Sequence, residues 1–140
     1  MNITRLLLAL FLLPALSARS AVTLEQTQAR SGTEFKATFR VAGGCHGAPT
    51  VRLRVQLPEG VSQARPQPKS GWKMEVSRLK DRVEAVTWTG GPLAEEHFDE
   101  FQLMMVLPRR LGAVRFPVEQ ECAKGEVVAS EPTLTLTPQQ

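Results

Sequence analysis

The heptapeptide Val-Arg-Leu-Arg-Val-Gln-Leu at residues 51–57 decides the fold, because apolar and polar residues alternate strictly along it. Side chains of a β-strand point to opposite faces with a period of two, so this pattern is typical of a strand with one buried face. Residues 34–41 repeat the pattern, with an apolar residue at each odd-numbered position. Both segments are therefore predicted to be half-buried strands.

Short alternating runs separated by proline and glycine continue toward the C-terminus. They cover residues 72–76, 83–88, 101–107, 114–118 and 133–137. No segment long enough for a core helix has helical periodicity, and residues 94–99 are predicted to form at most one or two helical turns. Strands of this length and spacing predict an all-β fold, an antiparallel immunoglobulin- or cupredoxin-like β-sandwich of about seven to nine strands.

The first twenty residues are predicted to be a cleavable signal peptide that precedes a single domain at residues 21–140. Arg5 is followed by an apolar run of about eleven residues, too short to cross a bilayer core of about 30 Å as a helix. Small residues place the cut after Ser20, so that Ala21 carries the free α-amine; an alternative cut lies three residues earlier. Pro14 disfavours the other interpretation, an uncleaved helix. The mature chain is thus expected to be periplasmic or secreted, with no membrane span after cleavage.

The charge balance argues against a nucleic-acid partner. Cleavage removes Arg5 and Arg19, which lowers the number of basic side chains from 17 to 15, against 14 acidic ones. The mature net charge is then about +1, and no run of lysine and arginine with interleaved aromatic residues remains. The scattered basic residues are interpreted as solvated faces.

Two cysteines, Cys45 and Cys122, are present, and both lie in the exported part of the chain. A pair without a third partner in an oxidising compartment is expected to form a disulfide. The two residues are 77 positions apart, for which loop-closure entropy gives at most about 4–5 kcal/mol. The competing interpretation is a metal or redox site, but no CxxC spacing supports it.

Motifs for catalysis are missing, so an enzyme is not predicted. His46 and His97 are the only histidines, and there is no GxSxG elbow for a nucleophile. The glycine pairs at residues 43–44 and 90–91 lie between predicted strands rather than before a helix, which favours turns over phosphate loops. The carboxylates around His97 are interpreted as solvated loop charge.

Copper is the metal to consider, since exported β-sandwiches often carry it; imidazole and amine nitrogens favour copper(II), and thioethers and thiolates favour copper(I). Met74 and Met105 are predicted to point into the core, and Met104 alone would make a poor site. His46 follows a cysteine in a glycine-rich loop, which would expose its ring, but the sequence offers it no neighbouring ligand.

Seven segments together resemble the YcnI-like family of exported copper-binding domains over nearly the whole mature chain. These are AVTLE at 21–25, GCHGAPT at 44–50, VQLPEGV at 55–61, PQPKSGW at 66–72, VTWTGGPL at 86–93, FDEF at 98–101 and FPVEQECAKG at 116–125. The resemblance implies a β-sandwich linked to copper handling, alongside other exported copper-handling proteins. It also implies a histidine brace, in which a histidine freed by signal cleavage binds the metal through its α-amine and its ring, near a carboxylate and a tryptophan.

This sequence departs from the implied brace at each position. Ala21 stands in place of the N-terminal histidine, Ala129 in place of the tryptophan, and His46 where related sequences have an acidic residue. Two functions are therefore expected. The first is a copper-associated protein with a weak, degenerate copper site made by His46 and the α-amine of Ala21. The alternative is a non-metal protein-interaction module of the periplasm or cell envelope that contacts a partner through loops such as residues 95–100.

Overall fold

Residues 22–139 are described by a computed structural model, in which they form twelve β-strands and no helix. The strands are β1 (Val22–Leu24), β2 (Gln28–Arg30), β3 (Glu34–Ala42), β4 (Thr50–Gln56), β5 (Ser62–Pro66), β6 (Trp72–Leu79), β7 (Arg82–Leu93), β8 (Phe98–Val106), β9 (Gly112–Arg115), β10 (Val118–Cys122), β11 (Val127–Ser130) and β12 (Thr133–Thr137). The predicted all-β class is confirmed. The predicted signal peptide at residues 1–20 and Ala21 lie outside the described residues.

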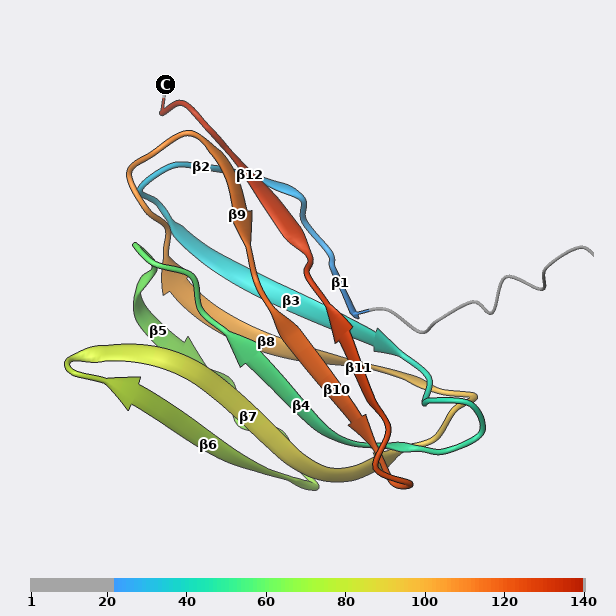
Figure 1. The fold of residues 1–140 in the computed structure, drawn as a ribbon. Coiled ribbons are helices and arrows are strands. Elements are labelled where there is room, and N and C mark those ends of the chain that lie inside the picture. The colour runs from blue at the N-terminus through green and yellow to red at the C-terminus, as the bar shows by residue number, and fades with distance from the viewer. Residues whose placement is uncertain (1–21, 140) are drawn as a thin grey trace, which may run out of the picture.

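The two segments with the clearest alternation lie in the two facing sheets (Figure 1). Strand β3 belongs to a four-stranded sheet with the order β1-β3-β8-β5, and β4 to a five-stranded sheet with the order β11-β10-β4-β7-β6. All pairings within these two sheets are antiparallel. A small third sheet, β2-β12-β9, includes one parallel pairing, between β12 and β2.

The core between the sheets is built from the inward residues that the alternation predicts. Phe39 on β3 and Leu53 and Val55 on β4 are fully buried. The Phe39 ring meets Phe116 edge-on at 5.6 Å between centroids, and buried Trp88 packs on Phe101 at 5.4 Å. These contacts explain why the period-two pattern specifies this fold, since a one-residue slip would expose all of these side chains.

The number of strands exceeds the seven to nine expected, and the excess comes from very short strands. Strands β1 and β2 have three residues each, and β11 has four. So few residues carry no readable alternation, and such segments become strands only because a longer neighbour offers them hydrogen-bonding partners. Residues 94–97 form a turn that leads into β8. Within residues 22–139 no helix has the length and hydrophobicity needed to cross a membrane.

Candidate functional site

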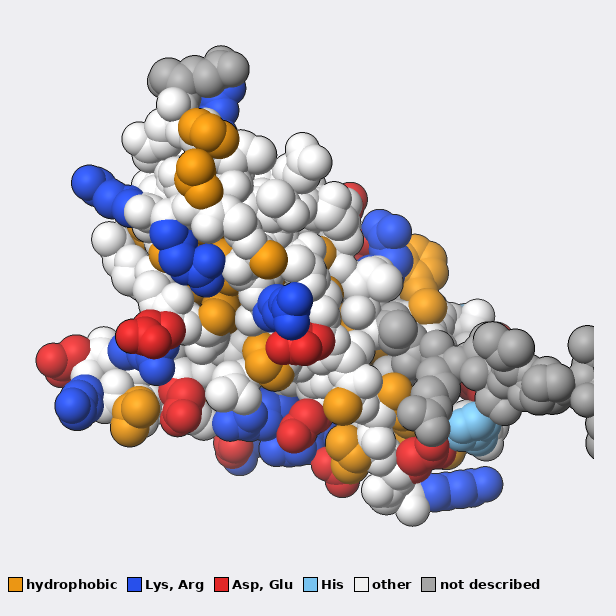
Figure 2. Space-filling view, turned by 45° about the horizontal axis from the view of Figure 1, so that its top comes forward, with side chains coloured by type: hydrophobic (Ala, Val, Ile, Leu, Met, Phe, Trp, Pro, Cys, Tyr) orange, Lys and Arg blue, Asp and Glu red, His pale blue; other side chains and the backbone are white. Residues whose placement is uncertain are grey.

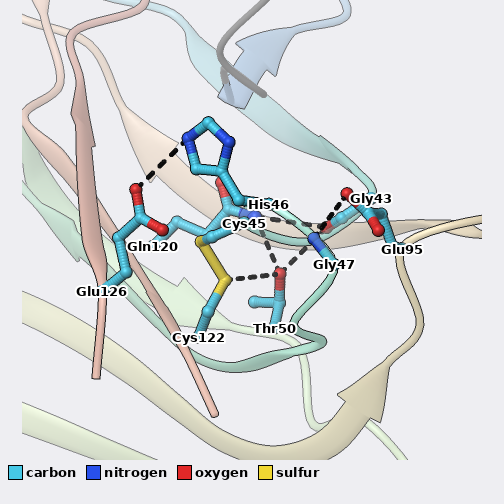
Figure 3. Close-up of a disulfide and its surroundings, with 9 residues drawn as sticks. All are labelled: Gly43, Cys45, His46, Gly47, Thr50, Glu95, Gln120, Cys122 and Glu126. Atoms are coloured by element: carbon cyan, nitrogen blue, oxygen red, sulfur yellow. Dashed lines mark hydrogen bonds and ion pairs between the residues drawn. A yellow bond between two sulfur atoms is a disulfide. The ribbon is translucent and has the colours of Figure 1, made fainter. Parts of the chain in front are cut away.

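The predicted disulfide is present, and Figure 3 shows it with its surroundings. The two segments that it joins, the β3–β4 connection and the end of β10, lie at one end of the sandwich (Figure 1). Cys45 comes from the β3–β4 connection, and Cys122 is the last residue of β10. Their Cα atoms are 5.9 Å apart, within the usual range for a bridge, and both residues are buried. The disulfide therefore ties the loop at residues 43–49, hereafter the cysteine loop, to the five-stranded sheet.

A buried polar network holds the base of the cysteine loop. The hydroxyl of Thr50 donates to the carbonyl oxygen of Gly43 at 2.9 Å. The Nε2 of Gln120 donates to the Thr50 Oγ1 at 2.7 Å and to the Gly43 carbonyl at 3.2 Å. Thr50 and Gln120 have no exposed surface. Because buried polar groups are costly without partners, these bonds favour a single position for Gly43.

The tip of the cysteine loop is a tight turn on which the side chain of His46 is exposed. The backbone groups of Cys45 and Ala48 exchange two hydrogen bonds, of 2.9 and 3.0 Å. Between them, His46 and Gly47 both have positive φ, 46° and 82°, as in a type I′ turn. Gly44 must be glycine here, since an added Cβ would lie 1.9 Å from the carbonyl oxygen of Ala48.

His46 has a carboxylate neighbour that sequence reasoning missed. Its Nε2 is 3.5 Å from Oε1 of Glu126, and the two side chains are 59% and 44% exposed. Glu126 lies in the β10–β11 turn, where its carbonyl oxygen accepts from the backbone N–H of Cys122 at 2.9 Å. The residues are 80 positions apart in the sequence. The disulfide is the signal that could have paired them, because each residue lies within four positions of a bridged cysteine.

His97 and the acidic residues beside it form no side-chain contact with the pair of His46 and Glu126 among the contacts of the described residues. His97 is exposed, and its carbonyl oxygen accepts from the N–H of Gly43 at 2.8 Å, so its backbone supports the cysteine loop. The carboxylate of Glu95 accepts from the N–H of Gly47 at 2.9 Å. Among residues 22–139 no group of three or more histidine, cysteine, aspartate or glutamate side chains could hold a metal ion.

Residues at the other brace-associated positions give no further ligand. Ala129 is exposed on β11 and lies opposite Glu119 of β10. Met105 is fully buried and Met74 packs on the core, as the alternation predicts. What the described chain brings together is thus the imidazole of His46, on the turn fixed by the disulfide, and the carboxylate of Glu126, from the β10–β11 turn.

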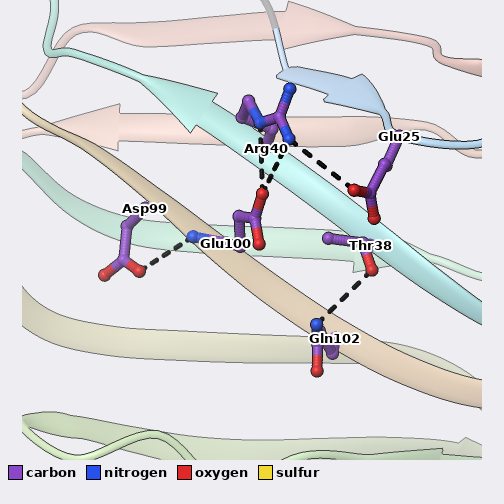
Figure 4. A network of polar contacts seen from close by, with 6 residues as sticks. All are labelled: Glu25, Thr38, Arg40, Asp99, Glu100 and Gln102. Carbon is purple, nitrogen blue, oxygen red and sulfur yellow. Dashed lines mark hydrogen bonds and ion pairs between the residues drawn. The ribbon is translucent and has the colours of Figure 1, made fainter.

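An ion-pair network on the outer face of the four-stranded sheet connects three of its strands (Figure 4). Arg40 on β3 contacts Glu100 on β8 at 2.8 Å and Glu25, just after β1, at 3.9 Å. The hydrogen bond with Glu100 raises the pKa of Arg40 above its ordinary value, so the guanidinium stays charged. The network links the edge strand β1 to β3 and β8.

Elsewhere the charges are mixed, and the face in Figure 2 shows acidic and basic side chains side by side rather than one large patch of a single sign.

Comparison with known proteins identifies a family of unknown function and a set of solved β-sandwich structures. The sequence profile of a family described as "Domain of unknown function (DUF1775)" matches residues 21–135. An uncharacterized protein from Nocardia farcinica with an immunoglobulin-like fold is 33% identical, with a TM-score of 0.75, over 84% of this chain and 98% of that one.

More distant structures share the fold alone. A non-cellulosomal cohesin from Archaeoglobus fulgidus is 9% identical, with a TM-score of 0.53, over 88% of this chain and 94% of that one. The cohesin CaCohA2 from Clostridium acetobutylicum is 11% identical, with a TM-score of 0.54, over 85% and 92%. Comparison with curated proteins gives no match.

Proposed function

The chain belongs to the DUF1775 family, the YcnI-like domains, and on this premise we propose that it is an exported protein of copper handling with a weak copper(II) site at His46. Glu126 is the second ligand in this proposal. The α-amine of Ala21, freed by signal cleavage, is the third. The protein would act beside other exported copper-handling proteins, in the periplasm or outside the cell, where its disulfide is stable.

The contact between His46 and Glu126 is the observation that carries the proposal. Imidazole nitrogen and carboxylate oxygen both bind copper(II). For ligand bonds of about 2.0–2.2 Å, as zinc makes with these groups, two ligand atoms 3.5 Å apart can bond one ion. The turn that carries His46 is already fixed by the disulfide and by positive φ angles, so binding would order few additional groups. Only two of the three proposed ligands are side chains that the described fold brings together, and a tight site has three or four such protein ligands, so the proposed affinity is weak.

Titration of the mature protein with copper(II) tests the proposal, after mass spectrometry has confirmed Ala21 as the first residue. A dissociation constant in the micromolar range is expected, with binding abolished in His46→Ala and weakened in Glu126→Gln. His97→Ala is the matched control, because it removes an exposed imidazole elsewhere and should leave binding unchanged. Affinity weaker than micromolar would rule out a copper carrier, and unchanged binding in His46→Ala would show that the ligand is another residue.

A second candidate, a protein-interaction module, is favoured by Phe98. This ring begins β8 and is 65% exposed, in the loop region at residues 95–100 that the sequence suggested as a contact surface. It pairs with Ala42 beside the cysteine loop, so a partner covering Phe98 would also lie near His46. Capture of partners from the exported fraction by the wild-type protein and by Phe98→Ser tests this candidate. Equal capture by both proteins would exclude this surface.

A further inference from the structure

The β6–β7 hairpin extends past β5 at the opposite end of the sandwich from the cysteine loop (Figure 1). Residues of this hairpin and of β5 line a groove. Two segments line this hairpin groove, residues 59–65 around β5 and residues 78–83 at the hairpin turn. Its volume is about 890 Å³. Ligand sites in proteins span about 300–1,000 Å³, so the groove has the capacity of a binding site.

Part of the groove lining is apolar and continuous with the core. Val61 and Val83 line it and are buried members of the main core cluster. Leu79 at the hairpin turn is 52% exposed and Ala64 is half-buried. An apolar side chain entering the groove would therefore exchange water for contacts with these four residues.

The charged part of the lining is predominantly basic. Four basic side chains, Arg65, Arg78, Lys80 and Arg82, face two acidic ones, Glu59 and Asp81. Within residues 22–139 only Arg65 among these basic residues forms an ion pair, a 3.4 Å contact with Glu34 between two exposed side chains. Such exposed pairs are weak, so the groove keeps an excess of positive charge.

Arg82 gives the most specific indication that the ligand of this groove is negatively charged. Its Nη1 is buried and has no hydrogen-bond acceptor among the described residues. A guanidinium nitrogen can only donate, and leaving a charged donor buried without an acceptor costs free energy. Arg82 lines the groove and is half-buried as a residue, so a rotation of its side chain that brings this nitrogen to the groove surface would let an incoming carboxylate accept a charge-assisted hydrogen bond from it.

The groove also lies between two sheet edges. Strand β5 ends the four-stranded sheet and β6 ends the five-stranded sheet, so each has one side that pairs with no strand of its own sheet. The pairing of β5 with β8 shifts register between Ser62 and Arg65, and Gln63 within this break has a φ of 50°. Free backbone groups at such edges can accept an extended chain as an added strand.

We propose that the hairpin groove binds an extended acidic segment of a partner protein. A carboxylate of the segment accepts hydrogen bonds from Arg82, its further acidic residues pair with Arg78 and Lys80, and an apolar side chain packs on Val61 and Val83. A free anion could pair with the basic side chains but would not contact the apolar lining or hydrogen-bond to the strand edges. A peptide can do all three, so the groove fits a peptide better. The site is separate from His46, so this interaction is independent of the proposed copper function.

Fluorescence anisotropy with the labelled hexapeptide Glu-Val-Glu-Leu-Glu-Val tests the proposal, with Lys-Val-Lys-Leu-Lys-Val as the opposite-charge probe. Saturable binding of the acidic peptide that weakens with added salt is expected, together with weaker binding of the basic one. The double variant R78E/K80E changes two exposed residues of the groove and should lower affinity for the acidic peptide by about tenfold or more. The variant K36E/K124E makes the same change of charge outside the groove and should bind as the wild type does.

Several outcomes would overturn the proposal. These are equal binding of the two peptides, unchanged affinity in R78E/K80E, and complete competition by inorganic phosphate at equal concentration, which would assign the groove to a free anion. Analytical sedimentation of the protein without peptide measures its oligomeric state and provides a further test. A dimer that R78E/K80E dissociates would make a second copy of this chain the occupant instead of an acidic partner.

Discussion

Single residues at the base of the cysteine loop show how a few buried polar atoms position an exposed site. Thr50 both donates to Gly43 and accepts from Gln120, so its hydroxyl is the centre of the network. The Oε1 of Gln120 has no hydrogen-bond partner among the described residues, which leaves the Nε2 bonds as the contacts that orient this amide. His46 has no part in the network, yet its position depends on the loop that the network anchors.

Replacing Thr50 with valine should destabilise the protein by about 1–3 kcal/mol. Valine has nearly the same shape but leaves the Gln120 amide with one acceptor fewer in a fully buried site. Urea denaturation followed by tryptophan fluorescence gives the free energy of unfolding. Thr135→Val is the control, because Thr135 is exposed on β12 and should lose much less stability. Equal losses in the two variants would contradict the role given to the network.

At the scale of elements, the connection between β3 and β4 is a compact turn whose shape depends on glycine. Gly44 does not have a positive φ, so backbone conformation alone does not require glycine there. The requirement comes from the close approach of the Ala48 carbonyl oxygen across the turn. The sequence predicted a loop at this place, but the need for Gly44 became visible only with the turn folded back on itself.

Replacing Gly44 with alanine should lower stability by about 1–3 kcal/mol, the usual cost of forcing extra atoms into a packed site, because the backbone oxygen of Ala48 must move. It should also weaken copper binding at His46, which lies on the same turn. Thermal unfolding and copper titration measure the two effects. Ser70→Ala, at an exposed position between β5 and β6, is the control. Wild-type behaviour of the Gly44 variant in both measurements would contradict this geometry.

At the scale of the whole molecule, the disulfide connects two parts of the chain that meet only in the folded state. It joins the cysteine loop to the end of β10 and forms a small buried cluster with Ala48, separate from the main core. The main core, which includes the packed and buried rings of Trp88 and Phe101, holds the two sheets together without the bridge. We therefore expect the sandwich to fold without the disulfide, but with lower stability.

The double variant C45A/C122A should lose up to about 4–5 kcal/mol of stability, because an unfolded chain without the bridge regains the entropy of a 77-residue loop. Urea denaturation of the variant, and of the wild type with and without a reductant, measures the loss. The variant and the reduced wild type should agree within about 1 kcal/mol, the scale of a change at two small buried side chains. Oxidised wild type no more stable than the variant would show that the bridge does not constrain the unfolded chain.

The sequence by itself determined the class of fold, the inward residues of the long strands and the pairing of the two cysteines. These follow from local periodicity and from residue counts, which do not require knowledge of distant neighbours. Only the tertiary structure decided that Glu126 meets His46, that three-residue segments become edge strands, and that Arg78 and Arg82 share a groove with β5. Each of these depends on contacts between residues far apart in the chain, and such contacts arise from the packing of the two sheets rather than from any local pattern.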